Sequence, residues 1–155
     1  MKKLFLAFAL LVAFIGTAQT TFTGKVVKVK DGDTVVVLDS LNVQHTIRLA
    51  GVDAPEKKQD FGAIAKQFTI DQIALKTVSV KVITTDRYGR SVAWITYDKK
   101  NLAEELLKAG LAWHYKEYDK SKYLQSLEDT AKANKIGLWS LPNPIPPSQY
   151  RKSKK

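Results

Sequence analysis

The chain has 155 residues, which suits a single domain, and its 45% hydrophobic and 26% charged composition excludes wholesale disorder. Lysine and arginine number 25 against 15 acidic residues, so the formal net charge is +10, and this basic balance favours a polyanionic partner such as nucleic acid or an anionic membrane surface. The absence of cysteine excludes disulfides and thiol nucleophiles, and two histidines are too few for a typical histidine-ligated metal site.

The N-terminal segment has the pattern of a secretory signal. Two lysines follow Met1, the twelve residues 4–15 are all apolar, and residues 16–18 are small. Twelve apolar residues are too few to span a bilayer, which takes about 20. The alternatives are a membrane anchor or a buried strand. We expect residues 1–18 to be a signal peptide cleaved after Ala18, and we expect an exported protein with no membrane span in its mature form.

Three strands are predicted next, at residues 22–30, 35–38 and 43–49. The first and third alternate apolar with polar residues, and the second is a β-branched run. Asp31 and Gly32, between the first two runs, supply the chemistry of a tight turn. Together the three runs predict an antiparallel meander.

A helix and two further strands follow the meander. Apolar residues recur at helical spacing over residues 61–76, which predicts the first helix. Residues 77–83 and 91–97 then have the pattern of strands, and residues 86–90 join them.

The C-terminal third predicts two helices and a tail. Asn101 with Glu104 three residues later is typical of a capping box, and Gly110 marks the end of that helix. A third helix is predicted over residues 121–135. Four of the five prolines fall in the next stretch, so we expect residues 141–155 to form a mobile, proline-rich basic tail.

The predicted order is three strands, one helix, two strands and two helices. Five strands with a helix after the third match the Greek-key barrel of the OB-fold. We therefore expect an α+β, mainly β fold over residues 19–140: a five-stranded OB barrel with three helices. Such barrels commonly bind nucleic acids, but the fold alone does not establish a function.

Two acidic clusters lie at the ends of predicted strands. Asp33 stands in the turn after the first strand, and Asp53 follows the third. Because a meander brings adjacent strand ends together, these two carboxylates could share a site. Carboxylates flanked by backbone carbonyls suit a hard cation such as Ca²⁺. The alternative is that Asp31 only makes the turn and Asp53 only ends a strand.

Arg48 and Arg90 form a second candidate group. Arg48 lies inside an otherwise apolar strand, and Arg90 follows a turn glycine. A guanidinium group presents a planar fork of donors that binds phosphate bidentately, so two of them opposite a cation could hold a phosphodiester. The alternative is that both are structural, with Arg48 paired to a carboxylate of a neighbouring strand and Arg90 paired to Asp86.

The third group is aromatic. Tyr88, Trp113, Tyr115 and Tyr118 occur among basic residues. Aromatic side chains on a basic surface can stack on exposed bases, although at least one of these four is expected in the core.

The motifs together resemble the staphylococcal nuclease (thermonuclease) family. The resemblance rests on residues 31–34 (DGDT), 47–56 (IRLAGVDAPE) and 86–90 (DRYGR), which occur in the same order. Residues 101–112 and 137–140 also resemble the family, and the similarity covers about residues 22–140. Three motifs in order are far more specific than any one of them.

The resemblance implies an OB barrel with three helices and a Ca²⁺-dependent hydrolase that cleaves phosphodiester bonds of DNA and RNA and leaves 3′-phosphate ends. It assigns Asp33, Asp53 and the backbone carbonyl of Ala54 to the calcium ion. It assigns Glu56 to the attacking water.

The same resemblance assigns Arg48 and Arg90 to the scissile phosphate and Tyr88 to a nucleotide contact. A second family tyrosine matches either Tyr115 or Tyr118. We expect a monomer that takes DNA and RNA as substrates.

Two rival functions remain open. One is an OB-fold module that binds nucleic acid without catalysis; such a module would be expected to lack some of the acids or arginines. The other is a basic interaction protein of the cell surface whose lysine-rich tail is the active part.

Overall fold

The computed structural model describes residues 20–154, so the predicted signal peptide lies outside the described residues. The strands are β1 (Thr21–Asp31), β2 (Thr34–Asp39), β3 (Gln44–Leu49), β4 (Val52–Asp53), β5 (Thr77–Thr85), β6 (Ser91–Tyr97), β7 (Lys100–Asn101) and β8 (Trp113–His114). The helices are α1 (Gly62–Ile73), α2 (Leu102–Lys108), α3 (Lys122–Ala133) and α4 (Pro147–Ser153), with a short 3₁₀ helix η1 (Gly137–Ser140).

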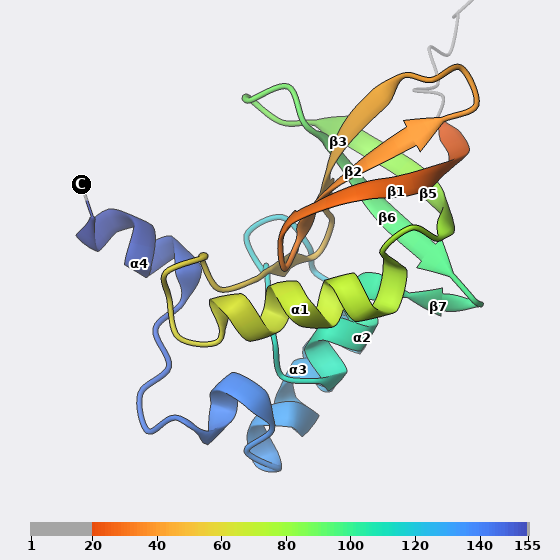
Figure 1. Ribbon diagram of the computed structural model, residues 1–155. Coiled ribbons are helices and arrows are strands. Elements are labelled where there is room, and N and C mark those ends of the chain that lie inside the picture. Colours follow the sequence, from red (N-terminus) through yellow and green to blue (C-terminus); the bar gives the residue numbers. More distant parts are fainter. Residues whose placement is uncertain (1–19, 155) are drawn as a thin grey trace, which may run out of the picture.

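Five of the strands close into a barrel (Figure 1). β1 pairs antiparallel with both β2 and β5, β2 pairs with β3, and β5 pairs with β6. The barrel closes because β3 and β6 pair in parallel, from Ile47 opposite Ser91 to Leu49 opposite Ala93. Register shifts in β1 bend this long strand so that it serves both neighbours. The predicted five-stranded OB barrel is therefore confirmed.

The core fills the barrel and continues beneath it. Each barrel strand contributes alternate side chains to the interior, and α1 and α2 cover the open end (Figure 1). Fully buried members of this core include Val26, Val35, Val37, Ile47, Val80, Ile95, Leu102, Leu106 and Leu107. The ends of β1, β3 and β4 are thereby held in fixed positions relative to α1.

The predicted start of α2 is also confirmed. Asn101 Oδ1 accepts hydrogen bonds from the backbone N–H groups of Ala103, at 2.9 Å, and Glu104, at 3.4 Å. These contacts satisfy two amides that have no partner within the helix. Among the described residues, no helix is both long and apolar enough to cross a membrane.

The end of the chain differs from the prediction. We expected three helices and a mobile tail, but residues Pro147–Ser153 form α4, which lies beside the loop between β4 and α1 (Figure 1). Pro147 occupies the first turn of α4, where its fixed φ angle favours a helix and its missing N–H costs nothing. The tyrosine and arginine of α4 contact the body of the protein, as described below.

Candidate active site

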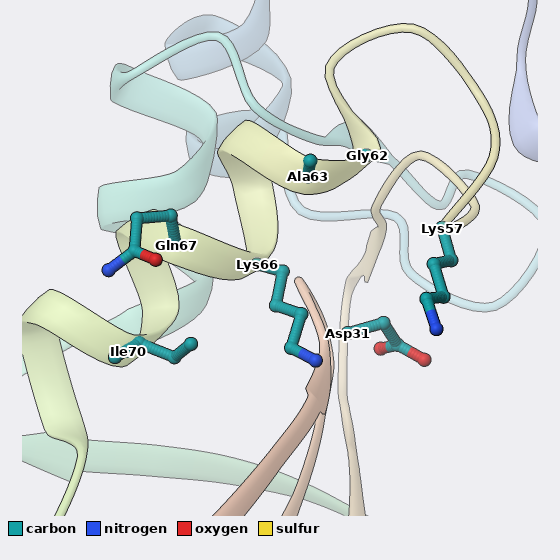
Figure 2. Close-up of a pocket in the computed structure, with 7 residues that line it drawn as sticks. All are labelled: Asp31, Lys57, Gly62, Ala63, Lys66, Gln67 and Ile70. Atoms are coloured by element: carbon teal, nitrogen blue, oxygen red, sulfur yellow. The ribbon is translucent and has the colours of Figure 1, made fainter.

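The candidate site lies where the β1–β2 turn meets the N-terminal end of α1. A cavity of about 420 Å³ opens there beside Asp31 (Figure 2). Lys57 and Lys66 lie on either side of the Asp31 carboxylate in this view, and the first residues of α1 complete the wall. The wall of this cavity is therefore partly cationic, and Asp31 is the residue of the β1–β2 turn that it contains.

The turn that carries Asp33 packs closely against its surroundings. Asp31 Oδ1 accepts a hydrogen bond from the backbone N–H of Asp33 at 3.2 Å, and Thr69 Oγ1 of α1 donates to the carbonyl of Gly32 at 2.7 Å. A Cβ atom at Gly32 would lie 2.9 Å from the Cβ atoms of both Ala54 and Ala65. Only glycine allows this approach, so the turn is anchored to β4 and α1.

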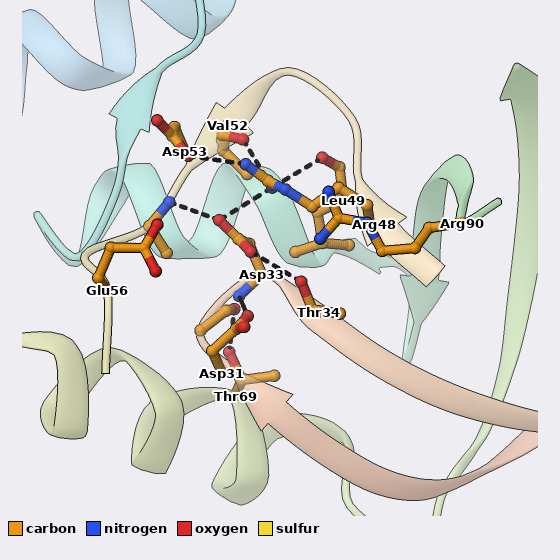
Figure 3. A network of polar contacts seen from close by, with 12 residues as sticks. Asp31, Asp33, Thr34, Arg48, Leu49, Val52, Asp53, Glu56, Thr69 and Arg90 are labelled. Carbon is orange, nitrogen blue, oxygen red and sulfur yellow. Dashed lines mark hydrogen bonds and ion pairs between the residues drawn. The ribbon is translucent and has the colours of Figure 1, made fainter. Parts of the chain in front are cut away.

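Arg48 brings the two predicted carboxylates together (Figure 3). Its Nη1 lies 2.9 Å from Asp33 Oδ2 and its Nη2 lies 2.8 Å from Asp53 Oδ1. Nη1 also donates to the carbonyls of Val52, at 3.0 Å, and Leu49, at 3.3 Å. The structural alternative for Arg48, a pair with nearby carboxylates, is thus the arrangement in this structure.

Both carboxylates are buried and both have perturbed pKa values. Burial raises the pKa of Asp33 to about 6, because the Arg48 charge offsets only part of the lost hydration and Asp31 adds repulsion. Burial also raises the pKa of Asp53, against the opposing effects of Arg151 and Arg48. Two desolvated carboxylates held in one place form a centre that favours a cation.

The loop after β4 carries Ala54, which is buried, and Glu56, which is partly exposed. The backbone N–H of Ala54 donates to Asp33 Oδ2 at 2.6 Å, so the loop after β4 is tied to the β1–β2 turn. Glu56 is more exposed, and its backbone packs against α1: a Cβ atom at Gly62 would lie 2.0 Å from the Glu56 carbonyl oxygen. The loop between β4 and α1 can therefore hold Glu56 in place only with glycine at this position.

Arg90 and Tyr88 come from the hairpin between β5 and β6. Arg90 Nε donates to Asp86 Oδ2 at 2.7 Å, which is the alternative pairing considered for this residue. Burial raises the pKa of Asp86, but the Arg90 amide and guanidinium and the Tyr88 amide outweigh it and lower the pKa below its usual value. The terminal nitrogens of Arg90 have no hydrogen-bond partner within residues 20–154, and Arg90 lies near Arg48 (Figure 3). The Tyr88 ring lies beside the guanidinium, 5.6 Å from ring centroid to Cζ, and is 69% exposed.

Tyr115 and Tyr118 follow the short strand β8, which pairs with β4 so that Trp113 stands opposite Asp53. Their rings contact each other edge to face, with centroids 4.8 Å apart. Burial and then the nearby Asp53 carboxylate raise the pKa of Tyr115, whereas Tyr118 is 74% exposed. Tyr115 is therefore the tyrosine nearer to the carboxylates, and Tyr118 extends the same aromatic surface outward.

Arg151 of α4 was not predicted at this site. Its Nη1 lies 2.7 Å from Glu56 Oε1 and 3.2 Å from Asp53 Oδ1, and its Nη2 lies 3.0 Å from Asp53 Oδ2. The sequence contained one signal for α4, namely proline at the first helical position. No sequence signal indicated that its arginine would contact residues more than 90 positions earlier.

A family model described as "Staphylococcal nuclease homologue" matches residues 46–141, more than half of the chain. The chain belongs to the staphylococcal nuclease family.

Several relatives in this family have similar sequences. An uncharacterized endonuclease of Haemophilus influenzae is 41% identical over 133 residues, which are 86% of this chain and 75% of that protein. An uncharacterized endonuclease of Escherichia coli O157:H7 is 41% identical over 132 residues, 84% of this chain and 86% of that protein. The Staphylococcal-like nuclease CAN1 of Arabidopsis thaliana is 42% identical over 109 residues, 70% of this chain but only 34% of that longer protein.

The family is generally calcium-dependent, and Ca²⁺ requires several oxygen ligands. Among residues 20–154, no group of three or more histidine, cysteine or acidic side chains is arranged as a metal site. The carboxylates of Asp33 and Asp53 do converge. Arg48 forms ion pairs with both of them, and Arg151 forms an ion pair with Asp53. These carboxylate oxygens are hard donors that already bind positively charged groups, so their chemistry fits Ca²⁺. Backbone carbonyls and water complete the coordination shell of Ca²⁺ in such sites.

Proposed function

We propose that this protein is a secreted, Ca²⁺-dependent nuclease that hydrolyses phosphodiester bonds of DNA and RNA and leaves 3′-phosphate ends. The observation that carries the proposal is the convergence of Asp33, Asp53 and Arg48 beside Glu56, with Arg90 and Tyr88 supplied by the neighbouring hairpin. A group of charged residues with a purely structural role would need only equal numbers of positive and negative charges. This one also presents an exposed acid, free guanidinium nitrogens and exposed aromatic rings on one side.

The roles of the side chains follow from their positions. Glu56, at the exposed edge, would orient a water molecule for attack on phosphorus and accept its proton. Arg90 would donate its free terminal nitrogens to non-bridging phosphate oxygens, whose negative charge grows in the transition state. The bond from phosphorus to the 5′ oxygen breaks, that oxygen takes up a proton, and the phosphate remains on the 3′ end.

Asp33, Asp53 and the Ala54 carbonyl would hold the cation, and when bound Ca²⁺ would supply positive charge that polarises a phosphate oxygen. Arg48 holds the two acids in place in the structure, and its Nε–H makes no hydrogen bond within the described residues. Arg48 would therefore position the acids and also offer a donor to the phosphate.

The substrate proposal rests on charge and stacking. The chain is strongly basic and attracts polyanions, and Lys57 and Lys66 line the cavity beside Asp31. Tyr88, Tyr115 and Tyr118 offer rings on which bases of a single strand could stack. None of these contacts distinguishes deoxyribose from ribose, so we propose both polymers as substrates.

The test is cleavage of defined single-stranded DNA and RNA oligonucleotides with Ca²⁺, with Mg²⁺ and with EDTA. We expect turnover with Ca²⁺, little with Mg²⁺, which demands stricter octahedral geometry, and none with EDTA. The downstream products should carry 5′ hydroxyl groups, which polynucleotide kinase labels directly. The upstream products should carry 3′ phosphates, which a phosphatase removes with the corresponding loss of mass. Asp53→Ala should weaken both calcium binding and cleavage.

Other outcomes favour a different function. Tight binding of the oligonucleotides without cleavage under any metal condition would favour the non-catalytic OB module. Equal turnover in EDTA would contradict the calcium site. Products ending in 3′ hydroxyl groups would contradict the proposed bond cleavage while leaving the nuclease activity intact.

Export and a monomeric state are part of the proposal. The basic start, apolar run and small residues at 16–18 support export. The intact mass of the protein recovered outside the cytoplasm should correspond to a chain that begins near residue 19, whereas a full-length chain in the membrane fraction would contradict export. Light scattering of the purified protein tests for the monomer.

A further inference from the structure

α4 reaches the candidate site from the far end of the sequence. Arg151 Nη1 contacts Glu56 Oε1 at 2.7 Å, and the same guanidinium contacts both carboxylate oxygens of Asp53 at 3.2 and 3.0 Å. The Arg151 side chain therefore contacts both Asp53, which is assigned to the cation, and Glu56, which is assigned to the attacking water.

The rest of α4 is held by few contacts. Tyr150 Oη donates to the Lys58 carbonyl at 3.1 Å, Gln59 Nε2 donates to the Ile145 carbonyl, and Pro147 is buried. The other residues of the helix face solvent or are half-buried, and the Arg151 side chain is itself 42% exposed. A seven-residue helix with this little burial is not stable alone, so the ion pairs of Arg151 hold it in place.

We propose that α4 is an autoinhibitory segment: Arg151 places its positive charge on Asp53 and Glu56, and it must leave before a divalent cation and the attacking water can use these acids. This inference rests on the proposed function, because it concerns the same site. Arg48 contacts only Oδ1 of Asp53, whereas Arg151 contacts both oxygens, so Arg151 covers the Oδ2 atom that a divalent cation would otherwise reach. Calcium binding and α4 docking are therefore in competition.

Competition has a quantitative consequence. The apparent dissociation constant of a ligand equals its intrinsic value divided by the fraction of molecules whose site is free. If α4 covers the site in about nine molecules of ten, removing Arg151 tightens Ca²⁺ binding about tenfold. When no calcium is present, the same change leaves Asp53 paired with Arg48 alone and removes the Arg151 contact of Glu56.

The first test compares Arg151→Gln with Lys152→Gln, a neighbour on α4 that is exposed and loses the same charge. Isothermal titration of each full-length protein with CaCl₂ should show tighter binding for Arg151→Gln only. In EDTA, Arg151→Gln should have a lower melting temperature than Lys152→Gln, and saturating CaCl₂ should remove this difference. Both readouts are independent of cleavage.

The second test follows α4 directly and uses the absence of native cysteine. A spin label at Gln149→Cys, on the exposed side of α4, should become more mobile when CaCl₂ is added. A label at Ser126→Cys on α3 is the control and should not change. In the Arg151→Gln background, the α4 label should be mobile before calcium is added.

The outcomes separate the two proposals. If the wild-type protein binds Ca²⁺ and cleaves, but Arg151→Gln and Lys152→Gln have equal calcium affinities, autoinhibition is wrong and the proposed function stands. Weaker calcium binding by Arg151→Gln also overturns autoinhibition, because Arg151 would then support the site. If neither the wild-type protein nor Arg151→Gln binds Ca²⁺, both proposals fail.

Discussion

Arg48 has a structural role in this structure and a second, catalytic role in the proposed mechanism. It bridges Asp33 and Asp53 and donates to two backbone carbonyls, so the local fold depends on it. The proposed chemistry also requires it near a phosphate. Arg90 differs, because its half-buried pair with Asp86 uses Nε and leaves both terminal nitrogens without a hydrogen-bond partner among residues 20–154. Substitutions at the two arginines should therefore separate structure from catalysis.

Arg90→Lys should lower kcat more than it raises KM, by roughly 10²–10³, because a preorganised donor to a developing oxyanion is worth about 2.7–4 kcal/mol. Lysine keeps the charge but loses the planar fork. The melting temperature should change little. Arg48→Lys should lower both kcat and the melting temperature, since it also breaks the bridge between the two acids. Near-normal kcat in both variants on short single-stranded DNA with saturating Ca²⁺ would remove these arginines from the mechanism.

In the absence of calcium, ionisation of Asp33 should lower the free energy of unfolding as the pH rises toward neutrality. Burial raises its pKa from 3.8 to about 6, so the folded protein binds this proton more tightly than the unfolded chain. The stabilising effect of the proton is complete below pH 3.8 and is lost as the pH rises to about 6. Asparagine resembles the protonated carboxyl, so in EDTA the melting temperature of Asp33→Asn relative to the wild type should be higher at pH 7.5 than at pH 4.

Asp39→Asn is the control, because the pKa of Asp39 is shifted in the opposite direction from that of Asp33. A hydrogen bond from His45 is the main reason that the pKa of Asp39 is lowered, so its carboxylate stabilises the fold above pH 3.8 and this contribution is lost on acidification. This variant should melt at a lower temperature than the wild type at pH 7.5. A gain for Asp33→Asn that grows toward pH 4 would contradict the raised pKa.

Among the elements, the short pair β4–β8 connects the carboxylates to the tyrosines. Glu128 of α3 holds this pair of strands in place and is 1% exposed. Its carboxylate accepts a hydrogen bond from the His114 backbone N–H at 3.1 Å and lies 2.9 Å from Lys132 Nζ. Burial raises the pKa of Glu128, but Lys132, the His114 amide and Gln125 together lower it below its usual value. α3 thus fixes the position of β8 through one buried carboxylate.

Glu128→Gln should destabilise the protein by about 1–3 kcal/mol, because charge-assisted hydrogen bonds to buried groups are lost. It should also raise KM, since the strand that carries Tyr115 is less well held. Asp129→Asn is the matched control: it removes one charge from the next residue, which is exposed. Urea unfolding and steady-state kinetics measure the two effects. Equal stability of the two variants would show that the Glu128 contacts contribute nothing measurable.

At the scale of the whole molecule, charge should determine how strongly nucleic acid binds. The chain carries a net charge of +10, and Lys57 and Lys66 line the cavity beside Asp31 (Figure 2). Each phosphate that a lysine neutralises releases counterions, so affinity falls as salt rises.

Binding of a labelled single-stranded oligonucleotide in EDTA should weaken linearly on a double logarithmic plot against NaCl concentration. Lys57→Gln and Lys66→Gln should each reduce the slope by about 0.7 if they contact phosphate. Lys100→Gln on β7, which lies on the other side of the molecule from α4, is the control (Figure 1). Anisotropy titrations at several salt concentrations give the slopes. An equal reduction by Lys100→Gln would show that net charge rather than the cavity is responsible.

The sequence by itself determined the order of the barrel strands along the chain, the cap of α2 and the motifs around Asp33, Asp53 and Arg90. These features are local: side-chain periodicity, turn residues and capping groups act on neighbours within a few positions, so they can be read along the chain. The expected signal peptide also belongs to this level and stays a prediction, because it lies outside the described residues.

Only the tertiary structure decided how the charges are paired. Arg48 could have faced a phosphate or a carboxylate, and the closing of the barrel placed it between Asp33 and Asp53. Arg151 lies 98 residues from Asp53 and 95 from Glu56, and no local pattern indicates such a contact. Ion pairs depend on distance in space and on burial, and both are set by packing across the whole fold, which neighbouring residues do not encode.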